Sequence, residues 1–79
     1  LRIASENATF AITSARIGTV AGAGGTQRLP RVVGMAHALE MLFAAEPVDA
    51  AHAHRIGLVN RVTANGQALA EAIRTADHY

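Results

Sequence analysis

Apolar residues recur along this chain with the spacing of short helices and in strand-like runs. The clearest helix is predicted for residues 35–45, where the apolar positions i, i+4, i+7 and i+8 form one stripe made of Met35, Leu39, Leu42 and Phe43. A last helix, capped by Asn65, is predicted to carry an apolar face made of Leu69, Ile73 and Ala76. Both faces are expected to pack against a partner surface.

Polar residues, glycine and proline mark where the other elements begin and end. Asp49 is a suitable N-cap for a helix over residues 50–56, and Gly57 is a suitable residue to end it. Another helix is predicted over residues 24–33, and Pro30 either kinks this helix or ends a first short one. The same patterns predict strands at 1–5, 8–12 and 58–62, a turn at 6–7 and a loop at 13–21.

Length and composition limit the chain to one small domain at most. A chain of 79 residues buries only ~60% of its unfolded surface, so its stability is expected to be marginal without partners. Hydrophobic residues make up 51% of the sequence but aromatic residues only 4%, which leaves the packing to alanine and aliphatic side chains. Because the sequence also opens without a methionine, on an apolar strand-like run, we expect the carboxy-terminal part of a single larger domain, in which residues 1–33 end the core and carry the candidate site loop, and residues 34–79 form a helical region.

Charge and cysteine usage exclude several classes of partner. The net charge is +1 and the basic residues form no stripe, so we expect no nucleic-acid partner. The chain has no cysteine, which excludes a disulfide framework and thiolate chemistry. No apolar run approaches the ~20 residues of a membrane span, so no membrane is expected and the default location is cytoplasmic.

Glycines at positions 22, 24 and 25 stand directly before or at the start of a predicted helix. Glycine can adopt a positive φ and lets a ligand approach the backbone, and the free N–H groups of a helix N-terminus favour negative charge. We expect any Cβ at Gly22 to crowd this turn. A nucleotide-binding Walker loop and a dinucleotide fingerprint are both excluded, because the first needs a Gly-Lys-Ser/Thr ending and the second a glycine where Gln27 stands. A purely structural turn remains the alternative.

Three motifs occur in order along the chain. They are Phe10 in the second predicted strand, Gly-Ala-Gly-Gly-Thr-Gln-Arg-Leu-Pro-Arg at 22–31, and Gly-Leu-Val-Asn-Arg-Val at 57–62. With these motifs, residues 2–62 resemble the enoyl-CoA hydratase/isomerase (crotonase) family. The resemblance implies an α/β protein with the crotonase-like (ClpP/crotonase) fold. It also implies an acyl-CoA substrate, with coenzyme A entering only as part of that substrate and no further cofactor or metal, and assembly into a homotrimer or hexamer.

The resemblance also assigns the candidate site residues. Family members hold the thioester carbonyl oxygen with two backbone N–H groups, and hydratases use two glutamates to hold and deprotonate a water. The second glutamate is expected four residues after Phe10, where this chain has Ser14, whose hydroxyl has no useful basicity near neutral pH. The N–H of Gly22 is implied to contact the attacking water. The residues implied to border the substrate are Gly22, Ala23, Gly24 and Gly25.

The function favoured by these residues is that of an enoyl-CoA hydratase, a lyase that adds water to a 2-enoyl-CoA, with the isolated chain itself inactive. The alternatives are a crotonase-fold isomerase or decarboxylase, and a non-catalytic acyl-CoA-binding or assembly module, because Ser14 replaces the expected glutamate. A metal site at His52 and His54 is disfavoured, because helical residues two apart point in different directions. Arg28 and Arg31 either reach a CoA phosphate or a carboxylate of a neighbouring subunit, or are surface charges.

Overall fold

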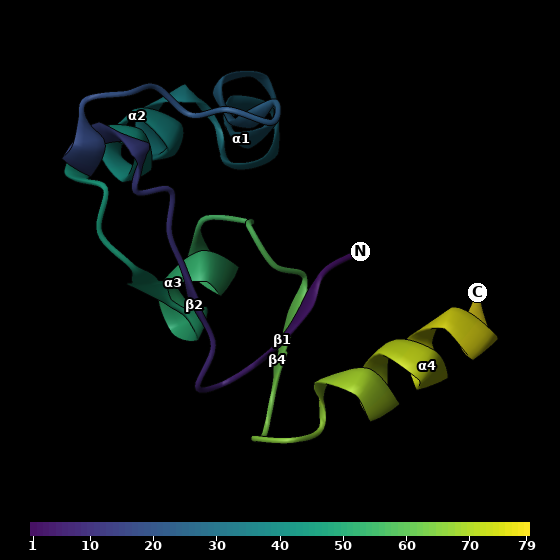
Figure 1. The fold of residues 1–79 in the computed structure, drawn as a ribbon. Coiled ribbons are helices and arrows are strands. Elements are labelled where there is room, and N and C mark those ends of the chain that lie inside the picture. The colour runs from purple at the N-terminus through teal and green to yellow at the C-terminus, as the bar shows by residue number, and fades with distance from the viewer. The chain divides into compact units, whose positions relative to one another are not determined.

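The computed structural model describes residues 1–79 and divides into two compact units, which are followed along the chain in Figure 1. The terminal unit contains residues 1–8 and 49–79, and the central unit contains residues 9–48. The division of a single larger domain between residues 33 and 34 stays a prediction. No helix in either unit is long and apolar enough to cross a membrane.

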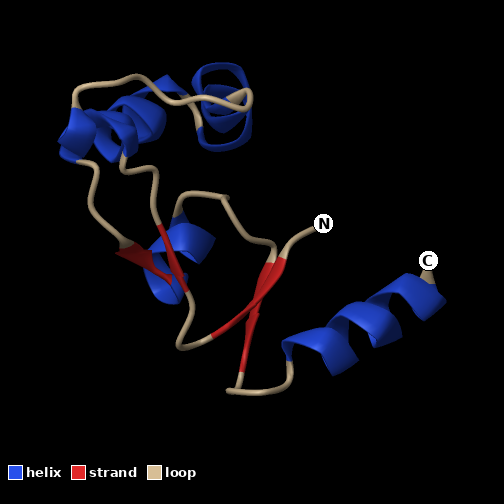
Figure 2. Cartoon of the chain, viewed as in Figure 1, coloured by secondary structure: helices blue, strands red, loops and turns tan.

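Two parallel strands form the sheet of the terminal unit (Figure 2). They are β1 (Ile3–Ser5) and β4 (Arg61–Thr63). Ala4, which is buried, lies opposite Val62 in the register. The pairing is extended by Asn60, whose side-chain oxygen accepts from the N–H of Arg2 at 2.8 Å and whose own N–H donates to the Arg2 carbonyl at 2.8 Å.

Helix α3 (Ala50–Arg55) begins and ends where local sequence signals predict. The Asp49 side chain accepts a hydrogen bond from the N–H of His52 at 2.7 Å, which confirms the predicted N-cap. Gly57 follows the helix with a φ of +82°, a conformation that suits glycine. The strand predicted to begin at residue 58 begins only at residue 61, because the N–H groups of residues 58 and 59 donate back to the Ala53 carbonyl.

Helix α4 (Ala68–His78) starts later than the sequence suggested. The predicted cap at Asn65 is wrong, since Gln67 occupies the N-cap position and makes no side-chain capping bond. The predicted apolar face is exposed, with Leu69 at 74% and Ile73 at 54% accessibility, whereas Thr75 on another face is buried. The helix therefore packs in its own unit through small and polar residues.

The central unit combines three helical segments with short strands, of which the second ends on Asp49 at the boundary with the terminal unit. Strand β2 (Thr9–Phe10) pairs with β3 (Val48–Asp49), and between them follow η1 (Ser14–Ile17), α1 (Gly25–Val33) and α2 (Met35–Ala44). The segment 13–21, predicted to be a loop, thus contains a turn of 3₁₀ helix. Pro30 neither ends α1 nor splits it, and its carbonyl accepts from the N–H of Gly34 at 2.9 Å.

Helices α1 and α2 pack on each other through a small core. The buried apolar residues of this unit are Leu29, Val33, Ala38, Met41 and Ala45. Because interior side chains must interdigitate closely, the small Ala38 and Ala45 allow α2 to approach its neighbours. The larger apolar stripe predicted on α2 does not enter this core, and Phe43 is 77% exposed.

Candidate functional site

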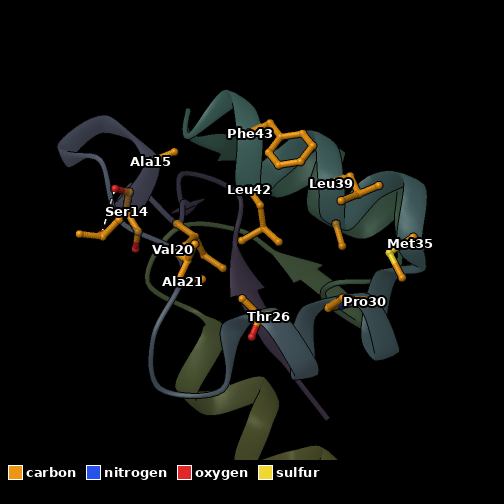
Figure 3. Close-up of a pocket in the computed structure, with 13 residues that line it drawn as sticks. Ser14, Ala15, Val20, Ala21, Thr26, Pro30, Met35, Leu39, Leu42 and Phe43 are labelled. Atoms are coloured by element: carbon orange, nitrogen blue, oxygen red, sulfur yellow. Dashed lines mark hydrogen bonds between the residues drawn. The ribbon is translucent and has the colours of Figure 1, made fainter.

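A cavity of about 390 Å³ lies within the central unit. Figure 3 shows its walls, which come from η1 and the segment after it, from α1, and from α2. This volume falls in the range of pockets that bind small molecules, ~300–1,000 Å³. The residues that line it are Ile12, Ser14, Ala15, Thr19, Val20, Ala21, Thr26, Pro30, Met35, Ala38, Leu39, Leu42 and Phe43.

The 3₁₀ segment η1 positions Ser14 at this cavity. The carbonyl of Ser14 accepts two hydrogen bonds, from the N–H and from the hydroxyl of Thr19, each at 3.1 Å. Gly18 makes the tight return possible, with a φ of +76° and its N–H donating to Ala15. The sequence-predicted site residue Ser14 is thus held by its own backbone beside an apolar cavity.

The apolar stripe of α2 forms one wall of the cavity. In Figure 3 the side chains of Leu39, Leu42 and Phe43 project from this helix around the open space, with Met35 at its far end. Sequence periodicity correctly placed these residues on one face. Within this chain, that face borders the cavity.

The glycine run forms the turn that leads into α1, next to the cavity. The N–H of Gly25 donates to the Gly22 carbonyl at 2.9 Å, and the turn passes through Ala23 and Gly24 with φ of +50° and +85°. Ala21 and Thr26, the residues on either side of positions 22–25, line the cavity, but the four residues between them do not. Their assignment to the substrate stays a prediction.

The expectation that a Cβ at Gly22 crowds the turn is wrong. No atom lies within 4 Å of such a Cβ, and the φ of Gly22 is not in the left-handed region. The crowded position is Gly25, where an added Cβ would stand 2.9 Å from the Cβ of Ala21. Gly24 is the position that needs its positive φ.

The lining of the cavity determines what chemistry the described residues can perform. Its polar side chains are the hydroxyls of Ser14, Thr19 and Thr26, and none of its residues is ionisable. A general acid or base with a pKa near neutrality is therefore not supplied by these walls. The cavity suits a mainly apolar group, with hydroxyls at Ser14, Thr19 and Thr26 available for hydrogen bonds.

The remaining candidate residues lie outside this cavity. Arg28 and Arg31 are exposed, and the Arg28 side chain runs beside Gly24, 3.1 Å from the point where a Cβ would stand. His52 is half-buried and His54 exposed on α3. No group of three or more potential ligands among His, Cys, Asp and Glu gathers in the structure.

The terminal unit contains a polar cluster around Glu71 on α4. Glu71 pairs with Arg74 at 2.6 Å, as its i, i+3 spacing suggests, and also with Arg61 on β4 at 3.0 Å. Arg61 additionally donates to the hydroxyl of the buried Thr75 at 2.8 Å. Hydrogen bonds from Arg74, and then from Arg61, hold the pKa of the Glu71 carboxyl below its usual range.

A model of the enoyl-CoA hydratase/isomerase family matches residues 1–79. The chain is 44% identical over 75 residues to a probable enoyl-CoA hydratase of Rhizobium meliloti, an alignment that covers 95% of this chain and 29% of that protein. It is 50% identical over 62 residues to the short-chain-enoyl-CoA hydratase of Clostridioides difficile, covering 78% of this chain and 40% of that protein. The chain therefore spans less than half the length of these curated relatives.

Solved structures resemble the chain over almost all of its length. The crystal structure of enoyl-CoA hydratase from Bacillus anthracis matches with a TM-score of 0.95 and 36% identity, covering 99% of this chain and 30% of that one. The enoyl-CoA hydratase structure from Mycobacterium tuberculosis matches with a TM-score of 0.92 and 37% identity, covering 96% of this chain and 30% of that one. The chain thus has the fold of part of these proteins.

Proposed function

The chain belongs to the enoyl-CoA hydratase/isomerase family and has its α/β crotonase-like fold, and from this we propose that it serves the addition of water to a 2-enoyl-CoA. The observation that carries the proposal is the apolar cavity bordered by Ser14, the position at which the family resemblance expects an acid–base glutamate. The full-length protein around this chain is the proposed hydratase. Its substrate is an acyl-CoA.

In the proposed reaction, the oxygen of water bonds to C3 of the enoyl group and a proton is delivered to C2. Negative charge collects on the thioester oxygen as the enolate forms, and backbone N–H groups directed at that oxygen stabilise it. Within this chain, the walls of the cavity are apolar, and the Ser14 hydroxyl can donate a hydrogen bond to the reacting water or accept one from it. The reaction needs no cofactor besides the coenzyme A of the substrate.

A second candidate function is favoured by Ser14, because a serine stands where the hydratase mechanism expects an acid–base glutamate. A placed acid or base contributes ~10²–10⁴ in rate, and no wall of the cavity contains an ionisable residue. An isomerase or decarboxylase that takes its acid–base group from another segment, or a module that binds acyl-CoA without turning it over, fits this lining. Each of these functions retains the acyl-CoA ligand.

The proposal is tested with the purified full-length protein and crotonyl-CoA. The hydratase function predicts formation of 3-hydroxybutyryl-CoA, followed by mass spectrometry of the product and by the loss of the conjugated double bond. Binding of a saturated acyl-CoA without hydration would support the non-catalytic module. Shift of a double bond or loss of carbon dioxide from a suitable acyl-CoA would support the other enzymes.

We also propose that the protein assembles into a homotrimer or hexamer. The exposed Leu69 and Ile73 of α4 support a contact with another subunit or with another part of the same protein. Sedimentation of the full-length protein tests the assembly: a trimer or hexamer supports a contact with another subunit, and a monomer supports a contact within the same protein. The cytoplasmic location stays a prediction, for cell fractionation to test.

A further inference from the structure

Asn65 and Gly66 form an exposed turn between β4 and α4. Gly66 has a φ of +78°, and the N–H of Gln67 closes the turn by donating to the Ala64 carbonyl at 3.1 Å. Asparagine and glycine are both common in turns, because they tolerate the conformations that turns need. Asn65 does not cap α4, so its side chain has no part in the fold or in the proposed function.

An asparagine followed by a glycine can react without any enzyme. The backbone nitrogen of Gly66 attacks the side-chain carbonyl carbon of Asn65, a new C–N bond forms, and the C–N bond to the side-chain amide breaks. The amide leaves as ammonia and takes up the proton of the Gly66 N–H. Water then opens the resulting cyclic imide at either of its carbonyls, which gives aspartate or isoaspartate. Water is the only co-reactant, and asparagine is one of the thermolabile residues of proteins.

The structure leaves the attacking nitrogen of Gly66 accessible. Both residues of the pair are exposed, and the Gly66 N–H donates to no backbone carbonyl. Glycine has no side chain to shield this nitrogen, and no atom lies within 4 Å of the point where a Cβ would stand. The flanking residues Ala64 and Gln67 are small or polar, so the turn has no apolar surface that calls for a covering segment.

The two other asparagines of the chain are held in ways that oppose this reaction. The N–H of Ala8, which would attack Asn7, already donates to a backbone carbonyl at 3.0 Å. The side-chain oxygen of Asn60 accepts from the N–H of Arg2 at 2.8 Å, and the residue that follows is the bulky Arg61. Breaking one ordinary hydrogen bond slows a reaction by up to roughly tenfold. The turn before α4 is therefore the place where this chain is most reactive.

We propose that Asn65 is a site of spontaneous deamidation, and that the isoaspartate formed there loosens the connection between β4 and α4. Isoaspartate continues the main chain through its side-chain carbon, which adds a methylene group to the turn. The helix that follows is joined to β4 by Arg61, which pairs with Glu71 at 3.0 Å and donates to the Thr75 hydroxyl at 2.8 Å. The lengthened turn no longer matches the spacing that these contacts need. This modification does not depend on the acyl-CoA ligand.

The test ages the full-length protein in warm, mildly alkaline buffer and follows its tryptic peptides by mass spectrometry. Replacement of the amide by a carboxyl group changes the mass of a peptide, and chromatography separates the aspartate and isoaspartate forms. We expect the peptide with Asn65 to convert at least roughly tenfold faster than those with Asn7 and Asn60, which serve as internal controls. Cleavage after arginine places the three asparagines in separate peptides, 3–16, 56–61 and 62–74.

Asn65→Gln is the matched variant, because it keeps an amide but would have to close a larger and less favourable ring. Aged unmodified protein should melt at a lower temperature than fresh protein, whereas aged and fresh Asn65→Gln should melt alike. Asn65→Asp adds the charge without the methylene group and should melt like the fresh unmodified protein. Conversion of Asn65 no faster than that of Asn60, or conversion only in denatured protein, would overturn the site. Conversion to isoaspartate with unchanged melting would overturn the effect on α4.

Discussion

At the scale of single residues, the candidate site contains an uncharged side chain at the position where the family resemblance expects a glutamate. Ser14 borders the cavity, and its carbonyl is fixed by two hydrogen bonds from Thr19. The sequence alone identifies Ser14 as a candidate site residue, because it stands four residues after Phe10, where the family resemblance expects a glutamate. Its place beside an empty apolar volume was not, because that volume depends on how η1 and α2 pack.

Ser14→Glu in the full-length protein is expected to raise the hydration of crotonyl-CoA by one or more orders of magnitude. A carboxylate at this position would be held beside the cavity and could take a proton from water, an effect worth ~10²–10⁴ in rate. Initial rates on crotonyl-CoA check the prediction, with Ser14→Gln as the uncharged control of similar size. Unchanged activity in a folded Ser14→Glu protein would mean that the site is built for other chemistry.

The glycine run allows a second prediction at this scale, about stability. Gly25→Ala would bring a methyl group to 2.9 Å from the Cβ of Ala21, and such overpacking costs about 1–3 kcal/mol. Gly22→Ala is the matched control, because open space surrounds its added methyl group. Chemical denaturation should show a large decrease in the free energy of unfolding for Gly25→Ala and little change for Gly22→Ala. Similar losses would show that the turn is governed by backbone freedom and not by crowding.

At the scale of elements, local signals were predictable and packing directions were not. The cap of α3 depends on one side chain reaching a backbone N–H three residues away, so Asp49 was sufficient to predict it. Helix α4 shows the limit, because Asn65 is an equally good cap in sequence but Gln67 stands at the N-cap position. Its buried face contains Thr75 and not the apolar stripe, since β4 presents Arg61 to this helix.

The pairing of β4 with α4 through Glu71 predicts a dependence of stability on pH. Since the folded state lowers the pKa of Glu71, the stabilisation is present above the unfolded pKa and is lost as the pH falls through the folded value. Melting temperatures measured from neutral to acidic pH should therefore decrease less in Glu71→Gln than in the unmodified protein. Glu40→Gln, at an exposed position of α2, should leave the acid-dependent decrease as it was. An identical decrease in all three proteins would show that the pair contributes nothing to stability.

At the scale of the whole molecule, the division into two units separates the cavity from the ion-pair cluster. The family and fold followed from short motifs, because the glycine run and the segment at 57–62 are specific in both residue type and order. The walls of the cavity come from segments spread over residues 12–43, and hydrophobic periodicity alone could not say whether the α2 stripe meets core, partner or ligand. The packed structure places the stripe outside the core of its unit and beside the cavity.

The absence of ionisable groups from the cavity predicts that the 79-residue chain alone does not hydrate crotonyl-CoA. Ser14 is too weak a base to activate water, and the relatives named hydratases are each more than twice as long as the part that matches this chain. Purified chain at high concentration should give no product above a mock preparation from the same host. Turnover that persists after repeated purification, and that disappears in Ser14→Ala, would show that the 79-residue chain contains a complete catalytic site.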